Sequence, residues 1–541
     1  MLHEKDIIAA SKAHPKPDIK YTYGTAGFRT KADILDSTCF RIGLVAALRS
    51  LVKEGRFIGV MITASHNPEE DNGVKIVDTR GEMLAPEWEG ICSQVANAPS
   101  DEAVVLELTK IVHEHRLDTS MTPRIVFGYD TRPSSSRLVK AMLDGLHAMH
   151  AEIVDGGMLT TPQLHYLVLA HNTQATDHPY GHPDEMGYYK KLAGAFQELL
   201  GGQKVKLPVV VDCANGVGAK AMQGLLDLLP KDLVDVTLLR TDVGKTGALN
   251  NGCGADFVKT NQRMPLGYEN EPSVKEDTLL CSFDGDADRI VFYYLTGPAS
   301  KPESFHLLDG DKIATLATDY LATLCKAAKL DIKLGCVQTA YANGASTEYL
   351  AKRVPITCTK TGVKHLHHAA ERHDIGVYFE ANGHGTVLFS PYTMVMIDMA
   401  NRLAKEGCQD SLHKLRTLPI LINQAVGDAI SDLLLVLYIL TMNGWDAYLW
   451  DSCYEDLPNR LAKIQVPDRF VFQTSDAERR LDQPHGLQDK IDAVVKRTPN
   501  GRAFVRPSGT EDVVRIYAEA RTPDDVEALL NSVCDLVKSA V

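Results

Sequence analysis

Short apolar runs followed by polar, glycine-rich turns recur along the chain, and helical stretches follow most of them. The clearest runs lie within residues 56–67, 123–136, 207–220, 278–294 and 374–389. Continuous apolar runs bounded by turn residues are typical of strands buried on both faces, as in parallel or mixed sheets covered by helices. The pattern therefore predicts several α/β units with ligand-binding loops at their strand ends.

Three polar breaks that contain glycine or proline divide the chain, near residues 178–185, 297–303 and 453–459. With 541 residues the chain is several times longer than the roughly 100–200 residues of one domain. The breaks predict four domains. Three are α/β domains and the fourth is a small C-terminal domain, over residues 1–195, 196–300, 301–450 and 451–541 respectively.

The C-terminal domain has a simpler pattern than the others. Apolar strands over residues 502–505 and 513–518 flank a polar loop, and Thr522-Pro523 then begins a helix. Apolar side chains recur along this helix at helical spacing, at Val526, Leu529, Leu530, Val533, Leu536 and Val537. This β-loop-β-α pattern fits a capping domain better than a full doubly wound sheet.

Composition and charge narrow the class of ligand. The chain is 44% hydrophobic and 23% charged, which excludes extensive disorder. Its 57 Lys and Arg against 70 Asp and Glu give a net charge of −13. Because a negative surface repels polyanions, we expect no binding of nucleic acid or anionic membranes. An anionic ligand must therefore find a local basic site.

Cysteine spacing and the apolar runs indicate the cellular compartment in which the protein is expected. The 11 cysteines form no C-x-x-C pair, which predicts reduced thiols. The first residues show no apolar core before a small-residue cleavage site. The most apolar run, residues 433–442, has about half of the roughly 20 residues of a spanning helix and predicts a buried helix. We therefore expect a cytoplasmic protein without a membrane span.

The first loop with candidate chemistry is Thr63-Ala64-Ser65-His66-Asn67-Pro68, directly after an apolar strand over residues 58–62. Pro68 stops helix propagation and leaves the Ser65 hydroxyl on a loop with nearby amide donors. Serine and asparagine also occur in turns for structural reasons, so this loop alone does not decide the function. Lys75 strengthens the interpretation, because a hydroxyl that exchanges a phosphoryl group needs a cation and a proton shuttle nearby.

The second loop is Asp284-Gly285-Asp286-Ala287-Asp288-Arg289, after an apolar strand over residues 278–283. Three carboxylates at alternate positions repel one another, and a hard cation with oxygen ligands relieves that repulsion. The spacing favours a metal site with open coordination positions, as a catalytic ion requires. An alternative is a haloacid-dehalogenase-like phosphohydrolase, in which Asp284 would be the nucleophile.

Two further loops offer groups that bind sugars and phosphates. Glu380-Ala381-Asn382-Gly383-His384-Gly385 lies between two predicted strands and presents a carboxylate and an amide, which suit sugar hydroxyls. Arg506-Pro507-Ser508-Gly509-Thr510-Glu511 presents a guanidinium, two hydroxyls and turn amides, with Arg515 on the next strand. Guanidinium forks and turn amides bind phosphate oxygens, so this loop predicts a phosphate cradle.

Together and in this order, the loops resemble those of the α-D-phosphohexomutase family. The resemblance runs from Gly24-Thr25-Ala26-Gly27-Phe28-Arg29 to Arg515, nearly the whole chain. It implies an α/β fold of three mixed α/β domains plus a small C-terminal β-α capping domain around a central cleft. It also implies a serine that carries a phosphoryl group and a Mg²⁺ ion held by aspartates and that phosphoserine. A sugar 1,6-bisphosphate is the implied intermediate and activator.

Carried over by matching positions, the resemblance assigns roles to individual residues. The implied catalytic residues are Ser65, Lys75, Arg29 and His66. The implied Mg²⁺ ligands are Ser65, Asp284, Asp286 and Asp288. The implied substrate-binding residues are Lys364, Glu380, Ala381, Asn382, Arg506, Pro507, Ser508, Gly509, Thr510 and Arg515. The implied ligand is a small phosphosugar, and no obligate protein partner is expected.

The sugar loop narrows the resemblance further. Members acting on glucose or mannose phosphates usually have G-E-x-S-G/F here, whereas this loop, with Lys360-Thr361-Gly362-Val363-Lys364-His365-Leu366-His367, resembles the eukaryotic phosphoacetylglucosamine mutase branch. That implies interconversion of N-acetylglucosamine 6-phosphate and 1-phosphate, which supplies UDP-N-acetylglucosamine synthesis. A phosphoglucomutase or phosphomannomutase, and a phosphosugar-binding protein without turnover, are alternatives. For His365, His367, His368 and His373, surface or core roles are favoured over zinc binding.

Overall fold

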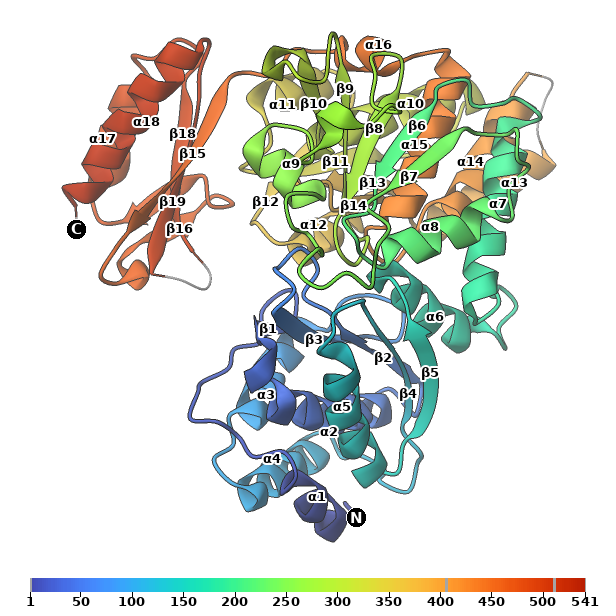
Figure 1. Cartoon of the computed structure of the whole chain (residues 1–541), viewed down its shortest axis with the longest axis vertical. Helices are drawn as coiled ribbons and strands as arrows, with labels where there is room; N and C mark the ends of the chain where they lie inside the picture. The colour runs from blue at the N-terminus through green and yellow to red at the C-terminus, as the bar shows by residue number, and fades with distance from the viewer. Residues whose placement is uncertain (1, 404–406, 509–511, 541) are drawn as a thin grey trace. The chain divides into compact units, whose positions relative to one another are not determined.

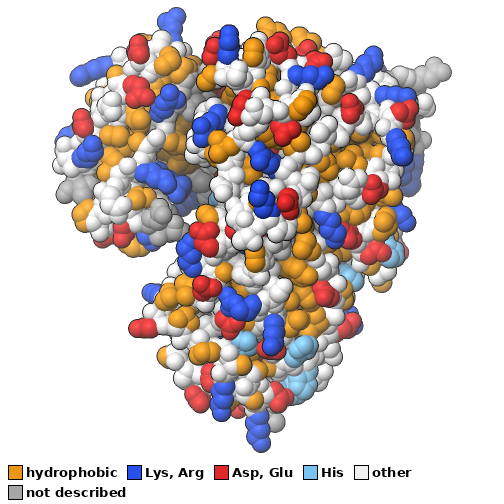
Figure 2. Space-filling view, viewed as in Figure 1, with side chains coloured by type: hydrophobic (Ala, Val, Ile, Leu, Met, Phe, Trp, Pro, Cys, Tyr) orange, Lys and Arg blue, Asp and Glu red, His pale blue; other side chains and the backbone are white. Residues whose placement is uncertain are grey.

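The computed structural model describes residues 2–403, 407–508 and 512–540, and Figure 1 labels most of its helices and strands. The chain forms two compact units. The first consists of Met1–Leu307 and Thr417–Gly444, and the second of Leu308–Arg416 and Trp445–Val541. On the face drawn in Figure 2, acidic and basic side chains are interspersed. Neither sign of charge dominates that face.

A five-stranded mixed sheet in the order β1-β3-β2-β4-β5 forms the N-terminal part of the first unit. Strands β2, β4 and β5 are parallel, and β3 is antiparallel to β1 and β2. Ile58, Val60 and Ile62 of β2 lie in the core that includes α2. A Cβ on Gly59 would contact Val168 of α6. Strand β2 is therefore buried on both faces, as its apolar run predicts.

The elements of this part are β1 (Phe28–Lys31), β2 (Phe57–Ile62), β3 (Asp71–Val77), β4 (Arg124–Tyr129), β5 (Glu152–Met158), α1 (Glu4–Ser11), α2 (Asp36–Val52), α3 (Pro86–Ala96), α4 (Asp101–Glu114), α5 (Ser135–Ala148) and α6 (Thr161–Thr173). Helix α2 packs against α5 and α3, and α6 packs against β2 and β4. Helices therefore cover the sheet and leave its strand ends for loops.

A second five-stranded sheet, in the order β10-β9-β8-β6-β7, follows along the chain. Strand β6 pairs in parallel with β7 and β8, and β8 pairs antiparallel with β9. The elements are α7 (Glu185–Leu200), β6 (Val209–Asp212), α8 (Gly218–Leu226), β7 (Val236–Leu239), α9 (Ala255–Asn261), β8 (Leu279–Phe283), β9 (Ile290–Leu295) and β10 (Phe305–Leu308). The loop between β8 and β9 carries the three aspartates predicted to bind metal.

Helix α15 (Ala429–Asn443) belongs to the first unit, where it packs against α7. Its residues 429–440 are all buried, which confirms the buried helix predicted over residues 433–442. Within residues 2–403, 407–508 and 512–540, no helix combines the length and the hydropathy that crossing a bilayer requires.

The second unit begins with a four-stranded sheet in the order β12-β11-β13-β14. Strand β11 is parallel to β12 and β13, and β14 is antiparallel to β13. The elements are α10 (Gly310–Ala328), β11 (Leu334–Thr339), α11 (Gly344–Ala351), β12 (Ile356–Thr359), α12 (Val363–Ala370), β13 (Ile375–Phe379), β14 (Gly385–Phe389), α13 (Pro391–Arg402) and α16 (Ala447–Asp451). Helix α14 (Gln409–Leu421) begins in the second unit and ends in the first. The predicted sugar loop connects β13 to β14.

The C-terminal part of the second unit is a three-stranded antiparallel sheet, β15-β19-β18, with a separate hairpin of β16 and β17. Its predicted strands and helix are found as β18 (Arg502–Pro507), β19 (Val513–Glu519) and α18 (Pro523–Lys538). The elements β15 (Asn459–Gln465), β16 (Gln473–Ser475), β17 (Arg480–Gln483) and α17 (Leu487–Val495) were not predicted. The α/β organisation with a smaller C-terminal domain is confirmed, and the exact domain boundaries stay predictions.

Candidate active site

Ser65 lies in the loop that follows β2, and its side chain is buried. Its Oγ donates a hydrogen bond to Oδ2 of Asp284 at 2.6 Å. The two residues are 219 positions apart in the sequence. Folding of the first unit thus brings the predicted phosphoryl carrier into contact with the predicted metal loop.

The backbone of Ser65 is left-handed, with φ of 50°. For a residue with a Cβ this conformation costs roughly 1–2 kcal/mol. The Ser65 N–H donates to Thr63 Oγ1 at 2.9 Å. Its carbonyl oxygen accepts from Asn250 Nδ2 at 2.9 Å and from Arg132 Nη2 at 3.1 Å. These contacts offset the strain and hold the hydroxyl toward Asp284.

Asp284, Asp286 and Asp288 are all buried, and one carboxylate oxygen of each lies within 4.8 Å of the others. Burial, and next the charges of Asp288 and Asp286, raise the pKa of Asp284 well above its ordinary value. Three carboxylates held this close out of water repel one another strongly. The repulsion favours a bound cation.

The donor set fits a magnesium ion. The Oδ2 of Asp286 accepts a hydrogen bond from Thr161 Oγ1 at 2.6 Å, which fixes the carboxylate. Its Oδ1 is buried and has no hydrogen-bond partner among the described residues. A buried acceptor without a donor is costly unless a ligand completes it. Carboxylate oxygens are the ligands that Mg²⁺ prefers.

Arg29 and Lys75 bring positive charge to the aspartates. Lys75 Nζ lies 3.8 Å from Oδ2 of Asp286 and 3.8 Å from Oδ2 of Asp288. Burial, and next the nearby Arg289, lower the pKa of Arg29, while the three aspartates oppose that shift. The Arg29 Nε is buried and no described residue accepts a hydrogen bond from it. Both cations therefore add positive charge beside the three carboxylates.

Gly27 allows the strand with Arg29 to approach Lys75. Its φ is 82°, and a Cβ there would lie 2.3 Å from the carbonyl oxygen of Val74 and 2.7 Å from the Cβ of Lys75. A side chain at this position would displace β3. Gly27, the second glycine of the Gly24–Arg29 motif, therefore has a packing role beside the site.

His66 lies next to the hydroxyl but is uncharged. Its Nδ1 is 3.3 Å from Ser65 Oγ and 3.8 Å from Asp256 Oδ2. Burial, and next the charge of Arg289, lower the pKa of His66 to about 3. Asp256 is already paired with Arg289 Nη1 at 2.7 Å. At neutral pH, His66 is therefore a hydrogen-bonding group rather than a cation.

Several residues that brace the site were not predicted. Thr63 Oγ1 donates to Asp130 Oδ2 at 2.6 Å, and Asp130 forms a fully buried ion pair with Arg132. Asp130 and Arg132 belong to the DTRPSS turn after β4, so their strand-end position was a signal available in the sequence. Thr161 and Asn250 have no comparable local pattern, because folding alone brings them to the site.

In the second unit, the loop Glu380–Gly385 is a tight turn with an internally bonded carboxylate. Glu380 Oε1 accepts from the backbone N–H of Gly362 at 3.2 Å, and Asn382 Nδ2 donates to Glu380 Oε2 at 3.4 Å. A Cβ on Gly310 would lie 1.8 Å from the Glu380 carbonyl oxygen, so α10 can begin here only with glycine. Glu380, Ala381 and Asn382 are partly exposed, as ligand-binding groups must be.

Arg506 and Arg515 are direct partners on β18 and β19, and Lys463 on β15 is opposite Arg515. Directly opposite residues share a face, so three cations form a row across the sheet. The Arg515 Nε is buried without a hydrogen-bond partner among the described residues. Since like charges opposite one another are destabilising, the row favours an anion. Lys463 was not among the predicted residues.

The remaining predicted cradle residues surround the end of β18. Pro507 ends the strand, and the buried Ser508 donates its N–H to the carbonyl oxygen of Val513 at 2.9 Å. Gly509 and Thr510 lie outside the described residues. Arg506 Nε donates to the Tyr341 hydroxyl at 3.0 Å, and its Nη1 lies 3.1 Å from Glu478 Oε1. The guanidinium is therefore held from two sides.

Lys364 and the neighbouring histidines lie on or near α12. Lys364 is in the first turn of the helix. His367 Nδ1 is 3.0 Å from the Tyr378 hydroxyl, and His368 Nδ1 is 3.1 Å from Glu371. Within the part of the chain that the structure describes, these histidines do not form a metal-binding group. Their contacts agree with the predicted core and surface roles.

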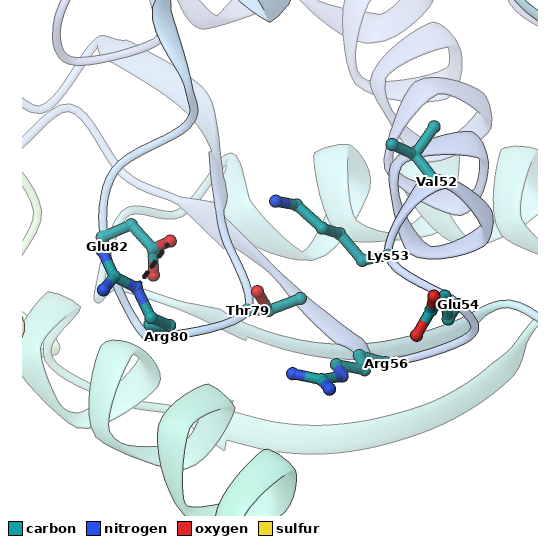
Figure 3. A pocket seen from close by; sticks show the side chains of 7 residues that line it. All are labelled: Val52, Lys53, Glu54, Arg56, Thr79, Arg80 and Glu82. Atoms are coloured by element: carbon teal, nitrogen blue, oxygen red, sulfur yellow. Dashed lines mark ion pairs between the residues drawn. The ribbon is translucent and has the colours of Figure 1, made fainter. Parts of the chain in front are cut away.

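A cavity of about 310 Å³ lies where β2 begins and β3 ends (Figure 3). The loop of Ser65 follows the opposite end of β2. In Figure 3, Lys53 extends from the end of α2 toward it, and Arg80 pairs with Glu82 at 3.6 Å. The lining residues are Val52, Lys53, Glu54, Arg56, Thr79, Arg80 and Glu82. None of the predicted site residues is among them.

Family models match most of the chain. Domains II and III of "Phosphoacetylglucosamine mutase AMG1" match residues 181–291 and 309–445. The "Phosphoglucomutase/phosphomannomutase, alpha/beta/alpha domain I" matches residues 36–101 and 88–176, and the C-terminal domain of the same family matches residues 461–536. The matches include the loops of Ser65, Asp284, Glu380 and Arg506.

Individual relatives cover nearly the whole chain. Phosphoacetylglucosamine mutase 1 of Schizosaccharomyces pombe is 49% identical over 523 residues, 96% of this chain and 99% of that protein. A crystal structure of Aspergillus fumigatus N-acetylphosphoglucosamine mutase in complex with GlcNAc-6P and magnesium is 47% identical, with a TM-score of 0.95 and coverage of 100% and 99%. A serine-to-alanine variant of that enzyme in complex with glucose 1,6-bisphosphate has a TM-score of 0.93, 47% identity and coverage of 99% and 99%.

Proposed function

The chain belongs to the phosphoacetylglucosamine mutase family, and from this premise we propose that it interconverts N-acetylglucosamine 6-phosphate and 1-phosphate with Ser65 as the phosphoryl carrier. One observation carries the assignment of Ser65. Its hydroxyl is buried, held in a left-handed loop and bonded at 2.6 Å to the aspartate loop. A serine in an ordinary turn would need none of these constraints.

Asp284, Asp286 and Asp288 would hold Mg²⁺, together with an oxygen of the phosphorylated Ser65. When bound, Mg²⁺ supplies Lewis-acid stabilisation of charge on the transferring phosphoryl group. Arg29 and Lys75 add positive charge on the same side of the carboxylates. The Thr161 hydrogen bond to Asp286 keeps one ligand carboxylate oriented before the ion binds.

The proposed reaction has two balanced transfers. The O1 hydroxyl of N-acetylglucosamine 6-phosphate attacks phosphoserine, its proton passes to a nearby base, and the P–O bond to Ser65 Oγ breaks. Ser65 Oγ takes up a proton, so the products are the 1,6-bisphosphate and the free Ser65 hydroxyl. After the sugar turns around, Ser65 Oγ attacks the 6-phosphoryl group and gives up its proton, the P–O6 bond breaks, and O6 takes up a proton. This restores phosphoserine and releases the 1-phosphate. Lys75 is the proposed proton carrier, because its Nζ bears exchangeable protons and lies 3.8 Å from two of the aspartates.

The second unit would bind the part of the sugar that does not react. A guanidinium binds a phosphate without regard to the carbon that carries it, so Arg506 and Arg515 suit either end of the bisphosphate. We assign Ser508, Pro507 and the loop residues Gly509 and Thr510 to the same cradle. Glu380, Ala381, Asn382 and Lys364 are assigned to the sugar.

We also propose a cytoplasmic location. All 11 cysteines are free, and Cys39, Cys92 and Cys213 are examples of fully buried thiols. Free thiols persist in reducing compartments. A nucleotidyl transfer that forms UDP-N-acetylglucosamine consumes the sugar 1-phosphate. This chain would therefore supply the substrate of that reaction.

The test is the intact mass of the purified chain after incubation with excess N-acetylglucosamine 1,6-bisphosphate. We expect a gain of one phosphoryl group in the wild type and none in Ser65→Ala, with turnover reduced to roughly a few per cent or less. Phosphoryl incorporation in Ser65→Ala would instead favour the phosphohydrolase with Asp284 as nucleophile. Faster turnover of glucose 6-phosphate than of its N-acetylated analogue would favour the phosphoglucomutase alternative.

A further inference from the structure

The tip of the hairpin of β16 and β17 has an energetically unfavourable backbone conformation. Asp476, Ala477 and Glu478 have φ values of 49°, 56° and 68°. Three consecutive residues with a Cβ in the left-handed region are unfavourable, and glycine would adopt this conformation without strain. Strained backbone persists where surrounding contacts impose it, often at functional sites. The contacts of the tip residues therefore show which interactions this strained backbone maintains.

The Glu478 carboxylate joins two parts of the second unit. Its Oε2 accepts from the Thr361 hydroxyl at 2.6 Å and from the Thr361 N–H at 3.0 Å. Its Oε1 accepts from Arg506 Nη1 at 3.1 Å. The side chains of Glu478 and Arg506 are only 15% and 11% exposed. Because the ion pair is largely out of water, it orients its members more firmly than a surface pair.

The same contacts continue to the predicted sugar loop. Gly362, next to Thr361, donates its N–H to Glu380 Oε1 at 3.2 Å. Arg506 Nε is held separately by the Tyr341 hydroxyl at 3.0 Å. A guanidinium has several N–H donors, so these two contacts orient it and leave others for a phosphate. A chain of hydrogen bonds thus links the phosphate cradle with the sugar loop.

We infer that Glu478 is a positioning residue of the mutase reaction, which fixes the phosphate-binding Arg506 relative to the sugar-binding segment of Thr361 and Glu380. This inference rests on the proposed function. Glu478 does not contact the reacting atoms and acts through Arg506. It sets the separation between the phosphate-binding and the sugar-binding residues, and this holds equally for the 1-phosphate and the 6-phosphate.

The first experiment compares Glu478→Gln with the wild type and with Asp476→Asn. Asp476→Asn is matched, because it removes one charge from the same hairpin tip at a residue that pairs with exposed Arg479. For Glu478→Gln we expect KM for both sugar phosphates to rise roughly tenfold to a hundredfold, with kcat changed less than about threefold. For Asp476→Asn we expect both constants to stay unchanged. An unchanged or lowered KM in Glu478→Gln would overturn the inference.

A double-mutant cycle separates positioning from general stability. In an Arg506→Lys background, the effect of Glu478→Gln on KM should largely disappear, because its partner guanidinium is gone. An undiminished effect would mean that Glu478 does not act through Arg506. If Glu478→Gln fails to fold, Thr361→Val removes the hydroxyl contact alone and should still raise KM with kcat retained. A wild type without mutase activity would refute the proposed function, whereas normal KM in these variants of an active enzyme refutes this inference alone.

Discussion

One carboxylate oxygen of Asp286 is oriented by a hydrogen bond and the other has no partner among the described residues, so Asp286 is the most informative of the proposed metal ligands to change. Asp286→Asn keeps the size of the side chain and an acceptor for Thr161, but removes one negative charge. We expect the Mg²⁺ concentration for half-maximal activity to rise at least roughly tenfold, since ligand charge sets affinity for hard cations. Measuring activity against free Mg²⁺ checks this.

Asp432→Asn is the control for that measurement. Asp432 is buried in the same unit, burial raises its pKa well above the ordinary value, and among the described residues it lies outside the group of three aspartates. Its replacement should leave the Mg²⁺ dependence unchanged. Equal Mg²⁺ curves for Asp286→Asn and the wild type would remove Asp286 from the ligand set.

His66 makes stability depend on pH in a defined direction. Its pKa is about 3 in the folded chain, against about 6.5 when unfolded, so the unfolded state binds more protons between these values. Its contribution is complete above about pH 6.5 and is lost as pH falls toward 3. The free energy of unfolding, measured without metal from neutral pH down to about pH 4, should fall more steeply for the wild type than for His66→Asn. Parallel curves would show that His66 is not held neutral.

At the residue scale, local sequence motifs pointed to Ser65 and the aspartates as candidate site residues. They did not point to the residues that hold these side chains in place. Ser65 and the aspartates stand in short polar patterns directly after apolar strands, where ligand-binding loops are expected. Their mutual contact follows from the fold and not from spacing, since 219 positions separate Ser65 from Asp284. Thr161 and Asn250 are single polar residues whose partners lie far away in the sequence. No local pattern distinguishes them from other threonines and asparagines.

At the scale of elements, the cationic row across β15, β19 and β18 makes a prediction about binding. Arg515→Ala removes the central cation and should weaken binding of the 1-phosphate and the 6-phosphate alike, by about tenfold to a hundredfold. Titration calorimetry with each sugar phosphate measures this. Lys463→Ala serves as the comparison, with a smaller expected loss, because Lys463 is solvent-exposed. Impairment confined to one of the two phosphates would contradict a shared cradle.

The same sheet shows where element prediction fails. Strands β18 and β19 have apolar runs and were predicted, whereas β15 is polar and mostly exposed along its length. An edge strand that buries little apolar surface has no strong sequence pattern. The hairpin of β16 and β17 is shorter still, and its left-handed tip contains no glycine to mark the turn.

At the scale of the molecule, the first unit is completed by a segment from much later in the chain. Helix α15 packs against α7, and buried Asp428 at its start accepts from the Tyr188 hydroxyl at 2.9 Å. The Ala429 N–H also donates to the carbonyl oxygen of Ala287 in the metal loop at 3.1 Å. Apolar content predicted that this helix is buried. It did not predict which unit the helix belongs to, because that depends on long-range packing.

Because residues 417–444 belong to the first unit, a fragment without them should behave differently from the whole unit. Residues 1–307 alone lack α15 and leave its apolar partner surface on α7 uncovered. We expect that fragment to bind a hydrophobic dye and to unfold without a sharp transition, as followed by circular dichroism. Residues 1–307 joined by a flexible linker to residues 417–444 should regain cooperative unfolding. Cooperative unfolding of the shorter fragment would show that α15 is dispensable.

If Ser65 carries the phosphoryl group, as proposed, the complete burial of its side chain has a consequence for how long the chain stays phosphorylated. Water is a competing acceptor for any phosphoryl group, and it is present at far higher concentration than a sugar. Each phosphoryl group that is lost to water leaves the chain inactive until a bisphosphate phosphorylates the serine again. Because the Ser65 oxygen itself is shielded, an acceptor can reach the phosphoryl group only from the side opposite the serine. A bound sugar displaces water from that side, so one phosphorylation of the serine serves many turnovers. The cellular demand for activator is then set by the rare loss and not by the flux of sugar.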